Sequence, residues 1–248
     1  MAKSFFFLVG LFFCWGNAQA EEARIAVASN FSKTMMELKR VFELSEPHSL
    51  SLIFGSTGKL YAQIRNGAPF DILLSADQEA PRALYESSAE VYEEPFTYAI
   101  GKIALWSSWQ GLSAAKGPSL LESNDFRKLA LANPRLAPYG RAAVQVLRAL
   151  NLEQKLSSRL VYGESASQTH MLVATKNAEL GFIPFSFIFP RESIVVGSYW
   201  LVPKDLYDPV IQDGILIRKE NEAATSFINF LDSPKARDIV ERNGFDVP

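Results

Sequence analysis

Short apolar runs, rich in β-branched and aromatic residues, alternate along this chain with stretches in which apolar residues recur at helical spacing. Residues 32–44 show the helical pattern clearly, because Met35, Leu38 and Phe42 fall on one face. In the first part of the chain the pattern predicts strands over 24–28, 50–54 and 71–75 and helices over 32–44, 59–65 and 78–86. Strands that alternate with helices in this way are typical of a parallel sheet covered on both faces.

A longer β-rich segment, residues 96–107, interrupts this alternation and contains no helix-start signal. Beyond it the pattern predicts strands over 128–132, 159–162, 180–183, 193–202 and 210–217 and helices over 141–150, 167–176, 221–231 and 234–242. We therefore expect an α/β protein of two lobes, each a mixed, mainly parallel sheet flanked by helices. Two crossover segments, near residues 100 and 212, would join lobe I (21–100 with 213–248) to lobe II (101–212).

The first twenty residues have the pattern of an export signal. Lys3 precedes an almost unbroken apolar run over residues 5–15, and small residues stand at positions 18 and 20, as a signal peptidase requires. A membrane anchor is the alternative, but the apolar run is short for a membrane-spanning helix. Bulky Phe13 argues against a lipoprotein signal at Cys14. We expect residues 1–20 to be a signal peptide that is removed on export to the periplasm.

Composition excludes several classes of function. The 25 Lys+Arg against 27 Asp+Glu leave a net charge of −2, which does not fit a nucleic-acid-binding surface. A single cysteine rules out a disulfide framework, and with two histidines, His48 and His170, a zinc centre would depend mainly on carboxylates. The sequence also lacks the phosphate-loop, dinucleotide-binding, zinc-protease and nucleophile-elbow motifs. A binding protein without catalytic residues or a cofactor explains these features better than an enzyme does.

Small polar residues follow four of the predicted strands. They occupy residues 29–32, 55–58, 133–140 and 163–168, each at the start of a predicted helix. Helix N-termini present free backbone N–H groups and a partial positive charge, so four of them together would suit an anion. Each loop taken alone is also explained by ordinary helix capping or, for its glycines, by a turn.

The remaining titratable residues offer little for catalysis. Asp71 and Asp77 flank the strand predicted over 71–75, where capping or surface roles are expected. His170 falls within a predicted helix and is expected to be structural or on the surface, and His48 lies in a turn beside a proline.

At these same loops the chain resembles the substrate-binding proteins of molybdate ABC importers. The resemblance spans the chain after residue 20 and is carried, in order, by ASNF, FGSTGKLYAQIRNGAPFDILLSAD, FTYAIGKIALWS, NPRLAPYGRAA, GESASQ, AELGFIPFS and FINFLDSPKARDIVERNGF. It implies a type II periplasmic-binding-protein fold, whose two lobes close over one tetrahedral oxyanion. It also implies partners, a membrane permease and its ATPase, with molybdate, and tungstate as well, as the ligand.

The resemblance implies a ligand site built residue by residue. Its members are expected to be donors from both lobes that hold the oxyanion without another metal: Ser29, Asn30, Ser56, Thr57, Tyr139 and, through its backbone N–H, Ala166. Proline at 184 stands where other members use a tyrosine, and alanine at 166 stands where valine is common. Lys59 and Arg141 are expected to steer the anion or to contact neighbouring protein rather than to coordinate the ligand.

Other functions remain open from the sequence. A protein of the same architecture could bind sulfate, tungstate alone or a small organic anion. A secreted hydrolase using Ser29, Ser56 or Thr57 belongs to a different class, and it would need a general base where only two histidines exist. A fixed set of donors spaced for a large tetrahedral anion favours molybdate over the smaller sulfate, but not over tungstate. We expect a monomer that binds no nucleic acid.

Overall fold

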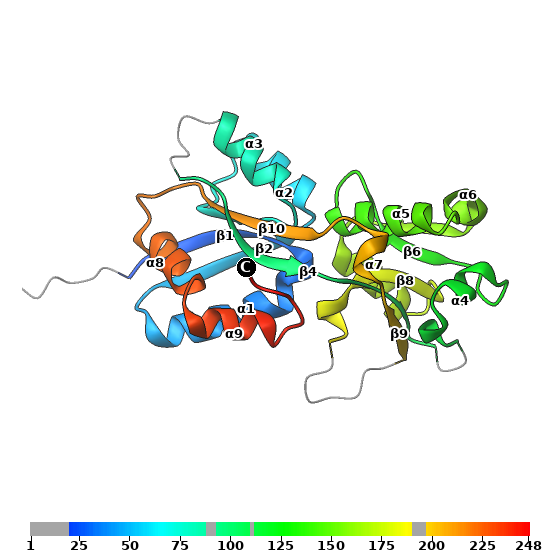
Figure 1. Ribbon diagram of the computed structural model, residues 1–248. Helices are drawn as coiled ribbons and strands as arrows, with labels where there is room; N and C mark the ends of the chain where they lie inside the picture. Colours follow the sequence, from blue (N-terminus) through cyan, green and yellow to red (C-terminus); the bar gives the residue numbers. More distant parts are fainter. Residues whose placement is uncertain (1–19, 88–92, 110–111, 190–196) are drawn as a thin grey trace, which may run out of the picture.

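The computed structural model describes residues 20–87, 93–109, 112–189 and 197–248, and in these the strands form two five-stranded sheets (Figure 1). The first sheet has the order β2-β1-β3-β10-β4 and the second the order β7-β6-β8-β5-β9. The strands of the first sheet are β1 (Glu22–Ala28), β2 (Ser49–Gly55), β3 (Ile72–Leu74), β4 (Phe96–Gly101) and β10 (Val210–Leu216). Those of the second are β5 (Ile103–Ser107), β6 (Leu129–Ala132), β7 (Leu160–Gly163), β8 (Leu180–Pro184) and β9 (Ser198–Leu201).

The two sheets share one pairing scheme. In the first, β1 is parallel to β2 and β3, while β10 is antiparallel to β3 and β4. In the second, β6 is parallel to β7 and β8, while β5 is antiparallel to β8 and β9. In each sheet, four strands therefore point the same way and one strand, β10 or β5, points the opposite way. The prediction of mixed, mainly parallel sheets is confirmed.

Helices cover both faces of each sheet because the strand side chains alternate between two apolar layers. Ile25 and Val27 of β1 pack with α1 (Ser32–Ser45), α8 (Glu222–Leu231) and α9 (Pro234–Glu241). Ala26, between them, faces the opposite layer with α2 (Thr57–Arg65) and α3 (Glu79–Ser87). We call this sheet with its five helices the first lobe.

The second lobe consists of the second sheet and the helices packed on it. They are α4 (Pro118–Glu122), α5 (Pro138–Ala149), α6 (Glu153–Leu156) and α7 (Ala166–Ala174). Ala143 and Val146 of α5 pack on one face of the sheet, and Val173 of α7 packs on the other.

The chain passes between the lobes twice. It leaves the first sheet at the end of β4 and enters the second at β5, with Lys102 between them, and it returns between β9 and β10. The last helices pack on the first sheet, as predicted, and Ile100 and Asp246 form an isolated bridge that ties the C-terminal segment to β4 (Figure 1).

Most predicted elements are present with small shifts of their ends. The β-rich segment 96–107 is two strands in different sheets, which fits the crossover expected near residue 100. Two helices begin earlier than predicted, at Pro138 rather than 141 and at Thr57 rather than 59. The short helices α4 and α6 were not predicted. Of the strand predicted over 193–202, residues 198–201 form β9, while 193–196 lie outside the described residues, as do residues 1–19 of the expected signal peptide.

Candidate functional site

The six candidate ligand residues lie at the starts of helices, after strands of both sheets. Ser29 and Asn30 form a single 3-10 turn with Phe31 between β1 and α1, and Ser56 and Thr57 join β2 to α2. The other two belong to the second lobe, where Tyr139 lies in the first turn of α5 and Ala166 is the first residue of α7. All six are at least 95% buried, which is unusual for polar loop residues.

Hydrogen bonds between the lobes bring these helix starts together. The backbone N–H of Ser167, next to Ala166, donates to Ser29 Oγ at 3.4 Å, and Ser167 Oγ donates to the Ser29 carbonyl at 3.3 Å. The N–H of Gly58, next to Thr57, donates to the Leu136 carbonyl at 3.0 Å, just before α5. The first-lobe loops therefore contact the starts of both α5 and α7.

Gln212 connects a third pair of candidate residues across the lobes. Asn30 Nδ2 donates to Gln212 Oε1 at 2.8 Å, and Gln212 Nε2 donates to the Tyr139 hydroxyl oxygen at 3.2 Å. The hydroxyl of Tyr98 also lies 3.2 Å from Gln212 Oε1 and donates to the Ser75 carbonyl at 2.7 Å. Asn30 and Tyr139 are thus held by one buried amide.

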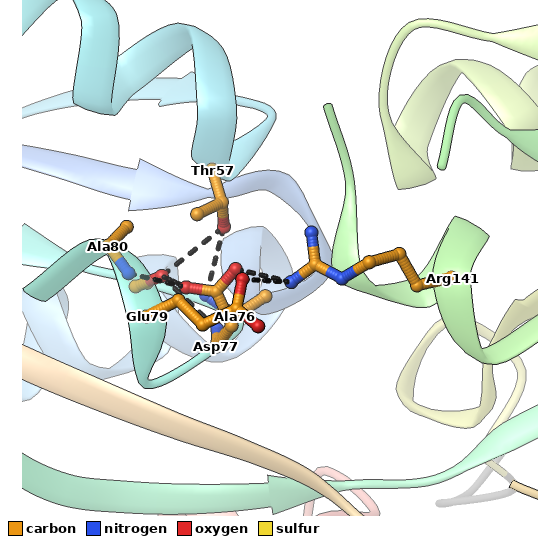
Figure 2. A network of polar contacts seen from close by, with 7 residues as sticks. Thr57, Ala76, Asp77, Glu79, Ala80 and Arg141 are labelled. Atoms are coloured by element: carbon orange, nitrogen blue, oxygen red, sulfur yellow. Dashed lines mark hydrogen bonds and ion pairs between the residues drawn. The ribbon is translucent and has the colours of Figure 1, made fainter. Parts of the chain in front are cut away.

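Several hydroxyl groups of this site accept a hydrogen bond without donating one to the protein. Ser29 Oγ accepts from Ser167 N, and the Tyr139 oxygen accepts from Gln212, yet within the described chain neither hydroxyl donates its own hydrogen. Thr57 Oγ1 accepts from the backbone N–H of Ala76 at 3.1 Å and has only a long 3.4 Å contact with Ser75 Oγ (Figure 2). The hydrogens of these hydroxyls remain available for an acceptor that is not part of the protein.

The hydroxyl of Ser56 neither donates nor accepts a hydrogen bond among the described residues. Ser56 is the N-cap residue of α2, but its side chain makes no capping hydrogen bond, and its buried Oγ has no partner among the described residues. A buried polar atom without a partner costs about 1–3 kcal/mol unless something satisfies it. Ser165, by contrast, caps α7 by accepting from Gln168 N at 3.2 Å. Helix capping therefore explains Ser165 but does not explain Ser56.

Burial keeps the phenol of Tyr139 neutral. Removal from water raises its pKa well above the usual value of a tyrosine, the neighbouring Tyr207 raises it further, and hydrogen bonds from Gln212 and Asn30 oppose this shift. The group is a hydrogen-bond donor throughout the physiological range. The six candidate residues include no charged side chain, so they can solvate an anion only through N–H and O–H dipoles.

Two cations, Arg141 and Lys59, form ion pairs between the lobes at the edge of the site. Arg141 Nη2 lies 2.7 Å from Asp77 Oδ2 and 3.5 Å from Glu79 Oε2, so that a side chain of α5 reaches the residues before and at the start of α3 (Figure 2). Lys59 of α2 lies 2.5 Å from Glu164, in the loop after β7. A cavity of about 310 Å³ adjoins the Arg141 pair. Both cations that were expected to steer the anion or contact protein thus bind carboxylates of the opposite lobe.

The other titratable candidates have structural contacts. Asp77 caps α3 by accepting from Ala80 N at 3.1 Å, as expected (Figure 2). The expectation for Asp71 was wrong: it is neither a cap nor on the surface, because it is 95% buried and accepts from Arg24 N at 2.7 Å. His170 stacks on Trp106, which fits a structural role, and His48 accepts from Glu21 N. No group of metal-ligating side chains occurs in the described parts of the chain.

Sequence reasoning missed three residues that support the site. Ser186 Oγ donates to the Asn30 carbonyl at 3.1 Å, Ser167 holds Ser29, and Gln212 holds Asn30 and Tyr139. Ser167 lies in the identified loop 163–168 but was not among the expected ligands, and Ser186 is a small polar residue after β8, the same signal that identified the four loops. Gln212 lies inside a strand, and its signal is a pair of polar residues, Gln212 and Asp213, within an apolar run.

Comparison with known proteins agrees with this architecture. The profile of a family described as bacterial extracellular solute-binding proteins matches residues 23–246. The molybdate-binding protein ModA of Azotobacter vinelandii is 43% identical over 230 residues, which cover 92% of this chain and 91% of that protein. ModA of Rhodobacter capsulatus is 38% identical over 230 residues, covering 92% and 89%.

A solved structure extends the likeness to the fold. The structure of the periplasmic molybdate-binding protein of Azotobacter vinelandii superimposes with a TM-score of 0.86 at 35% identity, covering 91% of this chain and 99% of that one. The expected two-lobed periplasmic-binding fold is therefore confirmed. With the profile match over nearly its whole length, the chain belongs to the family of bacterial extracellular solute-binding proteins, which bind solutes and are not enzymes.

Proposed function

We propose that this protein captures molybdate between its two lobes and delivers it to the permease of an ABC importer, which its ATPase drives. The observation that carries the proposal is the group of buried hydroxyls, Ser29, Ser56, Thr57 and Tyr139, whose hydrogens no described residue accepts at normal distance. A site made of free donors fits an ion that only accepts hydrogen bonds. The identity of 43% to a molybdate-binding protein supports molybdate as that ion.

The proposed ligand set contains the side chains of Ser29, Asn30, Ser56, Thr57 and Tyr139 and the backbone N–H of Ala166. The first N–H groups of an α-helix have no partner within the helix, and Ala166 is the first residue of α7. Pro184 ends β8, and without an N–H or a hydroxyl it supplies no donor, so Tyr139 takes the role of the phenolic ligand.

A doubly negative oxyanion can be held by such neutral groups. Each hydrogen bond to a charged group stabilises binding by roughly 1.5–3 kcal/mol net. Because the donors are buried and all but Ser56 lie in or beside groups that hydrogen bonds hold in place, they need little reorganisation when they replace the water of the ion. A small set of donors is therefore sufficient for tight binding, even after the costs of association.

The same donors give a basis for selectivity. Donors held at fixed positions for a larger tetrahedral ion cannot all reach the oxygens of sulfate, because these lie closer to the central atom. Some buried N–H or O–H groups would then be left unpaired. Tungstate is too close in size to be excluded, and we propose that it binds as well. A protonated phosphate would bring a hydrogen that this donor-rich site cannot accept.

The cellular setting follows from the same proposal. Family membership places the protein outside the cytoplasmic membrane, and we propose the periplasm, with residues 1–20 as the cleaved signal. We also propose a monomer whose two lobes both contact the permease. None of the described helices has the length and apolar character needed to cross a membrane.

Isothermal titration calorimetry of the exported protein tests the proposal. Molybdate and tungstate should each bind at one site per chain, and sulfate and phosphate at the same concentrations should show no competition. Equal affinity for sulfate would contradict the size argument and favour a sulfate-binding protein. Binding of a small carboxylate with no response to molybdate would replace the proposed ligand by an organic anion.

A further inference from the structure

Gln212 lies where the chain returns from the second lobe to the first. It is the third residue of β10, paired with Ala99 of β4, and its side chain is completely buried. A buried amide must find partners for both its oxygen and its nitrogen. Those partners come from different lobes, Asn30 from the first and Tyr139 from the second.

The environment of Gln212 indicates which way its amide points. Asn30 Nδ2 donates to Oε1 at 2.8 Å, so a donor group faces the carbonyl end. The nitrogen end then faces the Tyr139 oxygen at 3.2 Å and donates to it. This bond occupies a lone pair of the phenol and directs the phenolic hydrogen away from Gln212.

The backbone of β4 closes the space around this contact. A Cβ atom placed on Gly101 would lie 2.0 Å from the Tyr139 hydroxyl oxygen and 2.7 Å from Gln212 Nε2. The phenol and the amide are therefore packed directly against a glycine, which leaves them little room to take other positions. Packing and hydrogen bonding define the same arrangement of Gln212 and Tyr139.

We propose that Gln212 is a positioning residue for the oxyanion: it aims the hydroxyl hydrogen of Tyr139 and the amide of Asn30 at the ligand from a point between the lobes. This inference rests on the proposed function and deepens it, because it assigns a role to a residue outside the ligand set. Gln212 acts through these two donors. Because Asn30 and Tyr139 belong to different lobes, Gln212 can hold both of them only when the lobes are together.

A double-mutant cycle with molybdate as the probe tests this role. Gln212→Met keeps the length of the side chain but removes its hydrogen bonds, and Tyr139→Phe removes the donor that Gln212 is proposed to aim. We expect each single variant to weaken molybdate binding at least fivefold, measured by calorimetry. The double variant should be no more than about threefold weaker than the weaker single variant, because Gln212 has little left to position.

Two further variants sharpen the test. Gln212→Glu still accepts from Asn30 but as a carboxylate cannot donate to Tyr139, so it should lose at least as much affinity as Gln212→Met, and its buried charge should also lower the unfolding temperature. Gln145→Met is the matched control, because Gln145 also donates to a side chain of the β9–β10 connection, the exposed Asp208, at 2.6 Å, but is only half-buried and lies outside the proposed ligand set. It should bind molybdate within twofold of the native protein.

The outcomes distinguish this inference from the proposed function. A native protein that binds neither molybdate nor tungstate would contradict the proposed function itself. If the native protein binds, then fully multiplicative effects in the cycle, native affinity in Gln212→Glu or Gln212→Met, or failure of both variants to fold would overturn the positioning role. Strong coupling with folded variants would support it.

Discussion

At the scale of one residue, the hydroxyl of Tyr139 is a neutral donor whose hydrogen no described residue accepts. It accepts a hydrogen bond from Gln212, and burial raises its pKa, so the phenol stays protonated and its hydrogen stays free. A tyrosine prepared in this way can donate to an anion but has no charge with which to attract other ions.

Replacement of Tyr139 by phenylalanine removes this donor and little else. We expect the variant to bind molybdate more weakly by roughly 1–3 kcal/mol, about 5- to 150-fold, because one hydrogen bond to a buried charge is lost. Calorimetric titration measures the change. Tyr162→Phe is the control, since that exposed tyrosine of β7 lies outside the proposed ligand set, and unchanged affinity in Tyr139→Phe would remove Tyr139 from the site.

Gly101 leaves the space that the side chains of Tyr139 and Gln212 occupy. An alanine there would place its Cβ 2.0 Å from the Tyr139 oxygen, so Tyr139 and Gln212 would have to shift. We expect Gly101→Ala to lower molybdate affinity at least tenfold in a titration. Gly214→Ala in β10 is the control, because its Cβ would meet the Phe96 ring at 2.6 Å, away from the site, and should reduce stability more than binding. Equal losses of affinity in the two variants would contradict this assignment.

We expect the partly buried ring of His170 to make the stability of the folded protein depend on pH. Its ring stacks on Trp106 at 4.9 Å, and desolvation by burial lowers its pKa below the usual 6.5, so the folded protein favours the neutral ring. The contribution of His170 is complete above pH 6.5 and is lost as the pH falls from there through the lowered pKa, because the unfolded chain gains the proton first.

Thermal unfolding of the native protein and of His170→Phe between pH 7.5 and pH 5 measures this contribution. The native protein should lose more of its unfolding temperature on acidification than the variant does, since phenylalanine keeps the ring stack but cannot be protonated. An identical pH dependence of both proteins would exclude His170 as a source of acid sensitivity.

At the scale of elements, the apolar pattern was sufficient to predict most strands and helices, because each buries one side against a sheet. It indicated a crossover between the lobes near residue 100 but not the residue at which the segment 96–107 divides into β4 and β5, since Lys102 is only a single polar interruption. The start of α5 was missed by three residues because prolines usually interrupt helices, whereas Pro138 occupies the first turn, where it is tolerated. The short helices α4 and α6 lack enough residues to show a period.

The candidate site was predictable to a similar extent. Small polar residues after strands indicated the four loops, and the structure buries all six proposed ligands at the helix starts. Which hydroxyls cap a helix and which remain free depends on contacts between lobes, and these are not visible in sequence. Gln212 was missed because its partners are 182 and 73 residues away. The lobe boundaries proposed at 100 and 212 stay a prediction, and the second falls inside β10.

The ion pairs between α5 and the α3 loop predict a modest effect on closure. Arg141 is 39% exposed and Asp77 13%, and such partly exposed pairs contribute roughly 0.2–1 kcal/mol. Arg141→Gln should therefore weaken molybdate binding about two- to fivefold at low salt and less at high salt, measured by titration at 50 and 500 mM NaCl. Lys59→Gln, from a more exposed pair, should have a smaller effect. A hundredfold loss in Arg141→Gln would instead place Arg141 in direct contact with the anion.

At the scale of the whole molecule, the proposed site lies where the two lobes meet. The first lobe supplies Ser29, Asn30, Ser56 and Thr57, the second supplies Tyr139 and Ala166, and the chain crosses between them at Lys102 and again between β9 and β10. Membership of a solute-binding family removes the alternative of a secreted hydrolase, and it agrees with the binding role proposed for the buried serines. An anion that contacts both lobes must favour the arrangement in which they are together.

Molybdate should therefore stabilise both lobes at once. A ligand that binds only the folded, closed protein adds about 4 kcal/mol at a thousandfold excess over its Kd, and a chain of this size gains about 2–4 °C in unfolding temperature per kcal/mol. Differential scanning calorimetry should show one transition that rises with molybdate or tungstate concentration and does not respond to sulfate, with a smaller rise in Tyr139→Phe. If molybdate shifted only one of two separate transitions, the ion would be bound within a single lobe, and the shared site between the lobes would be wrong.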